Sequence, residues 1–369
     1  MENKKILLIS GCFYGQIVGG AEYQQYLIGC ELQKHGYEVH YLFIDNGKPI
    51  RNDANFHLIP IRKNTLLRKL IGNYFFLNSI KVYRTIKKIA PLKILVRTGF
   101  SYVGIAGFYS RRHECQLIWH VASSKDLDKR KISLSLRSIS DYIEWKFLVY
   151  GIKNTDKIIC QAMYQTSLLE KNYNKNCNLI LPNLHPSPTG KFKKKQTEIK
   201  ILWIANLKQL KRPELFIKLA EHIDDDNVTF IMIGRASTEA WVTFVAEKTK
   251  LLKNFQYTGE FPIDEVNKIL QESHILVNTS DYEGFPNTFI QAWLHGVPVV
   301  SLNVDPDNII KNYKLGFHSS SFEQMEKDLR ELITEKKLRQ DFGANAYKYA
   351  QKNHCVDKQI HNLIKLLKY

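Results

Sequence analysis

The chain has 369 residues, of which 44% are hydrophobic and 24% are charged. This is the composition of a globular protein, and the length allows two domains with full cores. No apolar run is long enough to span a membrane, which argues against a transmembrane protein. The net charge of +17 fits a basic surface, and equally a nucleic acid, an anionic lipid or a phosphate-rich ligand as partner.

The amino-terminal residues and the cysteines bear on the cellular compartment. The first residues, MENKKILLIS, pass from charged side chains into an apolar run of about six residues, too short for the apolar region of a signal peptide. We therefore expect a cytoplasmic chain. The six cysteines are scattered and form no Cys-x-x-Cys pair, so we expect reduced, buried thiols and neither a disulfide framework nor a zinc site.

The first half of the chain alternates predicted strands and helices. The loop after the first strand is rich in glycine, but it lacks the Gly-x-Gly-x-x-Gly fingerprint of dinucleotide-binding proteins, which weakens an oxidoreductase interpretation. Apolar, β-branched runs predict strands at residues 5–10, 38–45, 56–62, 93–98, 116–122, 156–162 and 179–183, and helices are predicted at 21–34 and 136–150.

Residues 62–90 mix many lysines and arginines with apolar side chains. Two interpretations stay open for this basic segment. It lies in a membrane interface and attracts anionic lipid, or it is a core helix whose lysines are solvated.

Residues 184–199 hold two prolines, one glycine and four lysines, which is typical of a linker. Strand and helix patterns alternate on both sides of it, which predicts two parallel sheets with helices on both faces. In the second half, strands are predicted at 200–205, 228–234, 255–261, 274–279 and 297–304, with helices from residue 213, at 263–273, at 287–295 and, as two or three helices, over 323–369.

The loop at residues 280–286 follows a predicted strand and precedes a predicted helix, and it carries Asp281 and Glu283. In open α/β sheets, ligands bind at this end of the strands. The first backbone N–H groups of a helix have no partner within the helix and lie at the positive end of its dipole. The loop is therefore a candidate site for an anion such as a diphosphate.

Two short runs around this helix carry a family resemblance. Glu283-Gly284-Phe285-Pro286-Asn287 before it and Gly296-Val297-Pro298-Val299-Val300 after it resemble the donor-site signature of glycosyltransferase family 4, which comprises retaining enzymes. The resemblance implies an α/β fold of the GT-B class, in which two Rossmann-like parallel-sheet domains face each other across a cleft. It further implies an acceptor-binding domain at residues 1–190, a nucleotide-sugar domain at 198–350 and a crossing helix at 351–369 that packs on the first domain.

The same resemblance implies roles for residues of the second half. Glu283 contacts the donor sugar and Lys211 binds the donor diphosphate. Two positions depart from the family pattern. A glutamate that binds the ribose hydroxyls is replaced by Gln291, which offers no charge, and a diphosphate-binding arginine is replaced by Asn206. Lys208 or Arg212 could supply the charge that is missing at Asn206. The other residues expected to bind the nucleotide sugar are Gly234, Arg235, Gly284, Phe285, Pro286, Asn287 and Thr288.

In the first half, Gly19-Gly20-Ala21-Glu22 resembles the family loop that faces the cleft near the donor phosphate and the acceptor. By the same resemblance, His120 lies close to the reaction centre. Asp126 could bind acceptor hydroxyls, but a solvated loop is the simpler explanation. The Asp-x-Asp pairs at 224–226 and 305–307 suggest a metal only by analogy with transferases of a different fold, and we expect none to be required.

These features predict a retaining glycosyltransferase that needs no cofactor. It would move a sugar from UDP-sugar or GDP-sugar to a hydroxyl of a glycan or lipid-linked acceptor, in bacterial surface polysaccharide synthesis. The enzyme would be cytoplasmic, and it would contact the inner face of the membrane if the first of the two interpretations of the basic segment holds. A non-catalytic nucleotide-sugar binder and a GT-B epimerase are the alternatives. A nucleic-acid partner is not expected, because the sequence has no zinc finger and no RNP motif.

Overall fold

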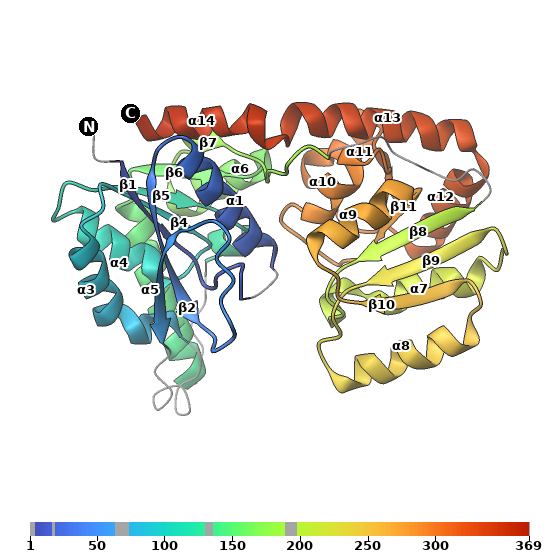
Figure 1. Ribbon diagram of the computed structural model, residues 1–369, viewed down its shortest axis with the longest axis horizontal. Helices are drawn as coiled ribbons and strands as arrows, with labels where there is room; N and C mark the ends of the chain where they lie inside the picture. Colours follow the sequence, from blue (N-terminus) through green and yellow to red (C-terminus); the bar gives the residue numbers. More distant parts are fainter. Residues whose placement is uncertain (1–3, 17–18, 63–73, 130–135, 189–197, 369) are drawn as a thin grey trace. The chain divides into compact units, whose positions relative to one another are not determined.

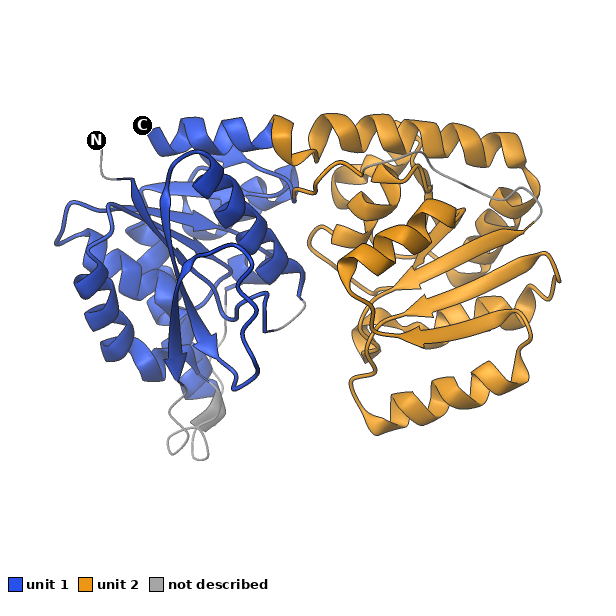
Figure 2. Ribbon diagram, viewed as in Figure 1, with its two compact units in different colours: residues 1–183, 359–369 blue, residues 184–358 orange. Residues whose placement is uncertain are grey.

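The computed structural model describes residues 4–16, 19–62, 74–129, 136–188 and 198–368. The chain divides into two compact units, of which unit 1 comprises residues 1–183 and 359–369 and unit 2 comprises residues 184–358 (Figure 2). Each unit contains its own parallel sheet and its own apolar core.

The sheet of unit 1 has seven strands in the order β3-β2-β1-β4-β5-β6-β7, and every pairing is parallel. Most of these strands and the helices around them are labelled in Figure 1. Strand order reverses between β1 and β4, which is where open sheets of this kind bind ligands at the carboxyl ends of the strands. The strands are β1 (Lys5–Ile9), β2 (Glu38–Asp45), β3 (His57–Arg62), β4 (Lys93–Arg97), β5 (Gln116–His120), β6 (Lys157–Cys160) and β7 (Leu179–Ile180).

Helices of unit 1 bury both faces of this sheet, which is why its strands read as nearly continuous apolar runs. At its carboxyl end the chain returns to this unit, where His361 of α14 lies edge-on to His35, with ring centroids 5.8 Å apart. The helices are α1 (Gly20–Lys34), α3 (Ser79–Ile89), α4 (Ser101–Ser110), α5 (Leu136–Lys153), α6 (Met163–Tyr173) and most of α14 (Val356–Lys368), with short 3-10 turns η1 (Phe75–Asn78) and η2 (Ser124–Leu127).

Unit 2 has six parallel strands in the order β10-β9-β8-β11-β12-β13. Alternate residues of β8 enter two different cores, since Trp203 packs on one face of the sheet and Leu202 on the other. The strands are β8 (Ile199–Ile204), β9 (Val228–Ile233), β10 (Phe255–Gly259), β11 (Ile275–Asn278), β12 (Val299–Ser301) and β13 (Gly316–His318). The helices are α7 (Pro213–His222), α8 (Glu239–Leu251), α9 (Ile263–Glu272), α10 (Asn287–Leu294), α11 (Ile309–Tyr313), α12 (Phe322–Thr334) and α13 (Lys336–Asn353), with 3-10 turns η3 (Gln209–Lys211) and η4 (Pro306–Asn308).

The expected strands are all present, so the prediction of two parallel α/β sheets is confirmed. Several strands are shorter than expected, β7 and β12 among them. Residues 181–183 do not extend β7, and β12 begins only after Pro298, because a proline has no N–H to donate to a neighbouring strand. The sequence analysis did not predict the strand β13 or the helices α4, α8 and α11.

The basic segment is described only from residue 74 onward, and its residues 63–73 lie outside the described part of the chain. Within α3, Val82 and Ile86 are buried in the core of unit 1, while the cationic side chains of the helix are exposed. This half of the segment therefore agrees with the interpretation of a core helix with solvated lysines. Among the described helices, none has the length and apolar composition needed to cross a bilayer.

Candidate functional site

The carboxyl ends of two neighbouring strands of unit 2 bring together the two residues with the clearest expected roles. Lys211 closes the short turn η3 after β8, and Glu283 lies in the loop after β11. The Lys211 Nζ atom lies 2.8 Å from Glu283 Oε2, and the side chains are only 21% and 17% exposed. An ion pair this enclosed is screened less by water than a surface pair.

The Glu283 carboxylate is held in place by further bonds from the end of β11. Its Oε1 atom accepts hydrogen bonds from Asn278 Nδ2 at 2.9 Å and from Ser280 Oγ at 2.8 Å. Thr279 Oγ1 donates to the Lys211 carbonyl oxygen at 2.7 Å, and Trp203 Nε1 donates to that same hydroxyl at 2.8 Å. The two loops are therefore tied together through side chains, and the ion pair is fixed on both sides.

The neighbouring cationic side chains, Arg212 and Lys208, differ in their ion pairs. Arg212 lies 3.5 Å from Asp281 and 3.4 Å from Glu214, so two carboxylates already compete for its charge. Lys208 is exposed and makes no ion pair with any residue that the structure describes. Asn206, which stands in place of the expected arginine, is half-buried at the end of β8. Of the two cations proposed to replace that arginine, Lys208 is the one more open to an anionic ligand.

The helix α10 follows the Glu283 loop directly, and its first residue is Asn287. Phe285 and Pro286 are buried beneath this turn, whereas Gly284, Asn287 and Thr288 are half-buried. Gln291 lies one turn into the helix, is 8% exposed, and directs its Nε2 atom toward Asn267 Oδ1 on α9 at 3.4 Å. Its amide is therefore largely enclosed between two helices of unit 2.

The carboxyl ends of β8, β9 and β10 meet around Gly234, which is expected to lie near the nucleotide base. Gly234 has a φ of +149°, and a Cβ atom there would lie 1.7 Å from the carbonyl oxygen of Ala205. Its N–H donates to the Gly259 carbonyl oxygen at 2.8 Å, and its own carbonyl oxygen accepts from Tyr257 Oη at 2.9 Å. The next residue, Arg235, is exposed. Only glycine permits this close approach of backbones without strain.

In unit 1 His120, the residue expected near the reaction centre, is buried against the guanidinium group of Arg97. His120 ends β5 and is paired in register with Arg97 at the end of β4. The Arg97 Nη1 atom lies 2.8 Å from His120 Nδ1, and Arg97 Nη2 donates to Asn183 Oδ1 at 2.8 Å. Each of the two paired side chains is 1% exposed. Burial and the adjacent guanidinium both lower the pKa of His120 well below its usual value, so its ring is neutral at neutral pH.

Arg97 was not singled out from the sequence, although an arginine that ends an otherwise apolar strand was a usable signal. Burial lowers the pKa of Arg97 to about 10, and the nearby carboxylates of Asp126 and Glu22 act in the opposite direction. Glu22 lies in the first turn of α1, immediately after Gly19 and Gly20, and burial raises its pKa. The end of the glycine-rich loop is therefore close to the polar side chains at the carboxyl ends of β4 and β5.

Asp126 is half-buried, and its carboxylate is directed at the backbone of its own turn. Its Oδ2 atom accepts hydrogen bonds from the backbone N–H groups of Ala122 at 2.9 Å and Ser123 at 3.1 Å. With Ser123 it forms a capping box at the start of η2. The carboxylate satisfies the backbone of the turn that follows β5, while Lys125 and Asp128 of the same turn are exposed, which agrees with the expectation of a solvated loop.

In each of the two Asp-x-Asp stretches, one aspartate accepts hydrogen bonds from the local backbone. Asp305 accepts hydrogen bonds from the N–H groups of Ile310 at 2.8 Å and Lys311 at 3.3 Å, which caps the short helix α11. Asp225, between the members of the first pair, accepts from the Asn227 N–H at 2.8 Å. Within the described residues, neither pair belongs to a group of side chains suited to holding a metal ion.

This geometry can be set beside known proteins. Residues 189–349 match the family model for glycosyl transferases group 1. The matched range contains the Lys211–Glu283 pair, the start of α10 and the Gly234 turn. Nearly all of unit 2 thus falls inside the family match, and unit 1 falls outside it.

Two curated relatives align with part of the chain. A Xenopus tropicalis protein named glycosyltransferase 1 domain-containing protein 1 is 26% identical over 156 residues, which cover 41% of this chain and 45% of that protein. A poly(ribitol-phosphate) alpha-N-acetylglucosaminyltransferase of Staphylococcus aureus is 27% identical over 157 residues, which cover 41% of this chain and 31% of that protein. The chain thus aligns with less than half the length of each of these relatives.

Solved structures resemble the whole chain. Sucrose-phosphate synthase from Thermosynechococcus elongatus superposes with a TM-score of 0.78 at 14% identity, covering 99% of this chain and 98% of that one. HepE of Anabaena in complex with UDP and glucose gives a TM-score of 0.73 at 13% identity, covering 99% of each chain. The lipopolysaccharide outer core galactosyltransferase WaaB gives 0.69 at 14% identity, covering 98% of this chain and 99% of that one. The chain has the GT-B fold, as the sequence analysis predicted.

Proposed function

We propose that the chain is a retaining glycosyltransferase that uses a nucleoside-diphosphate sugar as donor. The observation that carries this proposal is the Lys211–Glu283 pair, which lies inside the matched family domain, at the carboxyl ends of β8 and β11 and directly before α10. A fixed cation and the first N–H groups of a helix are the groups that a departing diphosphate requires. A carboxylate with two further hydrogen-bond donors at 2.8–2.9 Å is rigid enough to orient sugar hydroxyls.

In the proposed reaction the bond between the anomeric carbon and the diphosphate oxygen breaks, and a bond from the acceptor hydroxyl oxygen to that carbon forms on the same face. The proton of the hydroxyl passes to the departing diphosphate. Lys211, Lys208 and the N–H groups at the start of α10 stabilise the charge that develops on the leaving group. Glu283 orients the donor sugar, and no metal ion is required because these groups supply the positive charge.

The proposed donor carries UDP or GDP, and the proposed acceptor is a glycan or lipid-linked hydroxyl of a bacterial surface polysaccharide. HepE, which shares the fold, was solved with UDP and glucose. The Staphylococcus relative is named as a transferase acting on poly(ribitol-phosphate), and WaaB as a transferase of the lipopolysaccharide outer core. Unit 1 would determine the acceptor, with the Gly19–Gly20 loop and His120 on the acceptor side.

We also propose that the enzyme is cytoplasmic and touches the inner face of the membrane through α3. A cavity of about 510 Å³ beside this helix has four cationic residues and no acidic one in its lining. An exposed apolar side chain, Ile80, stands among them and is 71% exposed. The lining residues are Arg62, Leu77, Asn78, Ile80, Lys81, Arg84, Thr85 and Lys88. Clustered cations beside an apolar side chain favour an anionic lipid surface.

The deciding experiment is thermal denaturation of the full chain with UDP, GDP, ADP and their hexose conjugates, each with and without EDTA. A ligand that binds the native state raises the melting temperature by mass action. We expect a rise with one nucleotide that EDTA leaves unchanged and that Lys211→Ala abolishes. The absence of any rise, with every nucleotide and nucleotide sugar, would refute the donor site.

A second candidate function is favoured by the replacements at Asn206 and Gln291. A nucleotide-sugar binder without transfer activity would show the same thermal shift, but it would release no free UDP or GDP from the nucleotide sugar when acceptor glycans are added. Gln291→Glu separates the two cases, because a charged oxygen makes stronger hydrogen bonds to ribose hydroxyls. Transfer that appears only in this variant would favour the binder, and conversion of the sugar without an acceptor would favour an epimerase.

A further inference from the structure

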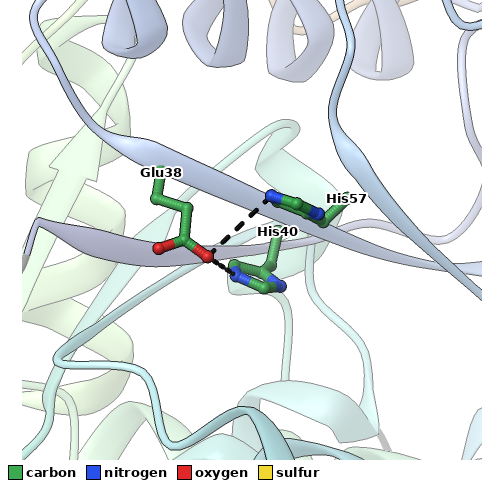
Figure 3. A group of neighbouring side chains, drawn as sticks. All are labelled: Glu38, His40 and His57. Atoms are coloured by element: carbon green, nitrogen blue, oxygen red, sulfur yellow. Dashed lines mark hydrogen bonds and ion pairs between the residues drawn. The ribbon is translucent and has the colours of Figure 1, made fainter.

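Two histidines and one glutamate meet at the amino ends of two neighbouring strands of unit 1. Glu38 and His40 lie two residues apart on β2 and so project from the same face of the sheet. His57 begins β3 and is the direct partner of His40 in the parallel register. Figure 3 shows the three side chains directed toward one another from these two strands.

The distances place three metal-binding atoms around one point. His40 Nε2 lies 2.6 Å from Glu38 Oε1, and His57 Nε2 lies 3.9 Å from the same oxygen. The two imidazole rings are stacked, with centroids 4.7 Å apart and planes inclined by 22°. One ligand atom from each residue lies within 4.8 Å of the other two. Within the described residues, this is the one group of three or more His, Cys, Asp or Glu side chains with that property.

We propose that Glu38, His40 and His57 form a binding site for a divalent transition-metal ion, with Zn²⁺ as the best-suited ion. Two imidazole nitrogens and one carboxylate oxygen are ligands that Zn²⁺ accepts, with a water molecule completing a tetrahedron. Zinc–ligand distances of about 2.0–2.2 Å place the ligand atoms of a tetrahedron about 3.3 Å apart, so His40 and Glu38 must separate slightly and His57 must approach them. His57 and Glu38 are 63% and 47% exposed, so their side chains are free to make that adjustment.

The charges around the three residues also bear on binding. A glutamate carboxylate at an exposed position such as Glu38 supplies a negative charge that favours a cation. Lys5 is the register partner of Glu38 on β1 and therefore adds a positive charge next to the ion. Its Nζ atom lies 3.4 Å from the Ile89 carbonyl oxygen, which holds the ammonium toward the end of α3. Lys5 should weaken metal binding without preventing it.

A bound ion would join the edge strand of the sheet to its neighbour. β3 is the outermost strand next to β2, so its other edge has no strand partner among the described residues. The site is at the amino ends of the strands, whereas His120 and Arg97 lie at the carboxyl ends of β5 and β4 in the same sheet. The ion would therefore act on the stability of unit 1, and sugar transfer does not depend on it.

The test uses the untagged full chain, treated with EDTA, dialysed and titrated with Zn²⁺ by calorimetry and with Co²⁺ by visible absorption. We expect one ion bound through nitrogen and oxygen ligands, without the sulfur-to-cobalt charge-transfer band that a cysteine ligand would give. His57→Gln and Glu38→Gln should each weaken binding by more than about tenfold, since even second-sphere changes at zinc sites cost that much. Lys5→Gln should tighten it.

The matched control is His222→Gln. His222 Nδ1 lies 2.7 Å from Glu326 Oε2, which reproduces the imidazole–carboxylate pair without a second histidine beside it. If wild type, His57→Gln and His222→Gln bind the same number of ions with equal affinity, the proposed site does not exist. Nucleotide-induced thermal shifts should be equal in wild type and His57→Gln, so this result is independent of the donor site.

Discussion

Lys211 Nζ lies 2.8 Å from Glu283 Oε2, so the cation proposed to bind the diphosphate is paired with the carboxylate proposed to contact the donor sugar. An incoming diphosphate must compete with Glu283 for this ammonium group. The same carboxylate also accepts hydrogen bonds from Asn278 and Ser280, and it therefore stays in place when Lys211 turns toward a ligand. The pair fixes both groups before the donor binds. It also lowers the affinity for the diphosphate, because the diphosphate must displace Glu283 from Lys211.

Glu283→Gln should therefore affect binding and transfer in opposite directions. Loss of the competing charge should strengthen the binding of free UDP or GDP by about fivefold, which corresponds to ~1 kcal/mol for a partly exposed ion pair. Transfer should fall sharply, because the donor sugar loses its orienting carboxylate. Calorimetry with the free nucleotide and an assay of sugar transfer measure the two effects. Glu265→Gln, which removes an exposed pair with Lys268, is the control and should change neither. Weaker nucleotide binding in Glu283→Gln would contradict this argument.

Lys208 and Arg212 are open alternatives for the charge missing at Asn206, and their surroundings distinguish them. Arg212 is already close to Asp281 and Glu214, whereas Lys208 makes no ion pair in the described part of the chain. Lys208→Ala should weaken nucleotide binding more than Arg212→Ala does, and its effect should diminish at high salt because the side chain is exposed. Binding constants at low and high ionic strength test this order. A larger effect of Arg212→Ala would assign the role to the arginine.

The sequence predicted the strands of both sheets well, because a parallel sheet buried on both faces requires apolar runs such as those at β1 and β8. The donor loop was predictable for a related reason, since Glu283 follows such a run and precedes a helix. The contacts of Lys211 and of Arg97 were not predictable, because their partners are 72 and 23 residues away in the chain and meet them only through sheet topology. The Glu38–His57 contact depends on strand register in the same way.

The membrane proposal predicts a charge-dependent interaction of unit 1. Replacing Lys81, Arg84 and Lys88 with glutamine should reduce co-sedimentation with vesicles that contain anionic phospholipid, because each cation contributes about 1 kcal/mol near such a surface. Vesicles of neutral phospholipid should bind neither protein. The control replaces three exposed lysines of unit 2, Lys250, Lys253 and Lys327, and should leave sedimentation unchanged. If the two triple variants lose equal amounts of co-sedimentation, net charge alone explains the binding and α3 has no special role.

Gly234→Ala should destabilise unit 2 strongly. The new Cβ atom would lie 1.7 Å from the Ala205 carbonyl oxygen, in a backbone conformation with a φ of +149°. Backbone strain alone costs about 1–3 kcal/mol, and displacement of the β8 end adds to it. Gly259→Ala is the matched comparison, because its φ is +74° but a Cβ atom there meets nothing within 4 Å. Urea denaturation should show a clearly larger loss for Gly234→Ala, and equal losses would rule out the clash as the cause.

The buried His185 predicts a loss of stability in mild acid. Burial lowers the pKa of His185 to about 3, with His354 and His295 contributing in the same direction, while a hydrogen bond to the Asn287 side chain opposes them. In the unfolded chain a histidine has a pKa of about 6.5, so between these values the unfolded state binds the additional proton. The free energy of unfolding should therefore decrease as the pH falls below about 6.5, by about 1.4 kcal/mol per unit for this one group.

Urea denaturation at pH 7.0 and at several values down to pH 4.5, followed by tryptophan fluorescence, measures this slope for the full chain. Acidic residues also lose stabilising charge over this range, so the difference between wild type and variant isolates the histidine. His185→Gln should lower stability at pH 7 and also flatten the decline with falling pH, because glutamine binds no proton. His318→Gln, at an exposed histidine of the same unit, should keep the wild-type slope. If the two variants show the same slope as wild type, His185 does not bind its proton preferentially in the unfolded state.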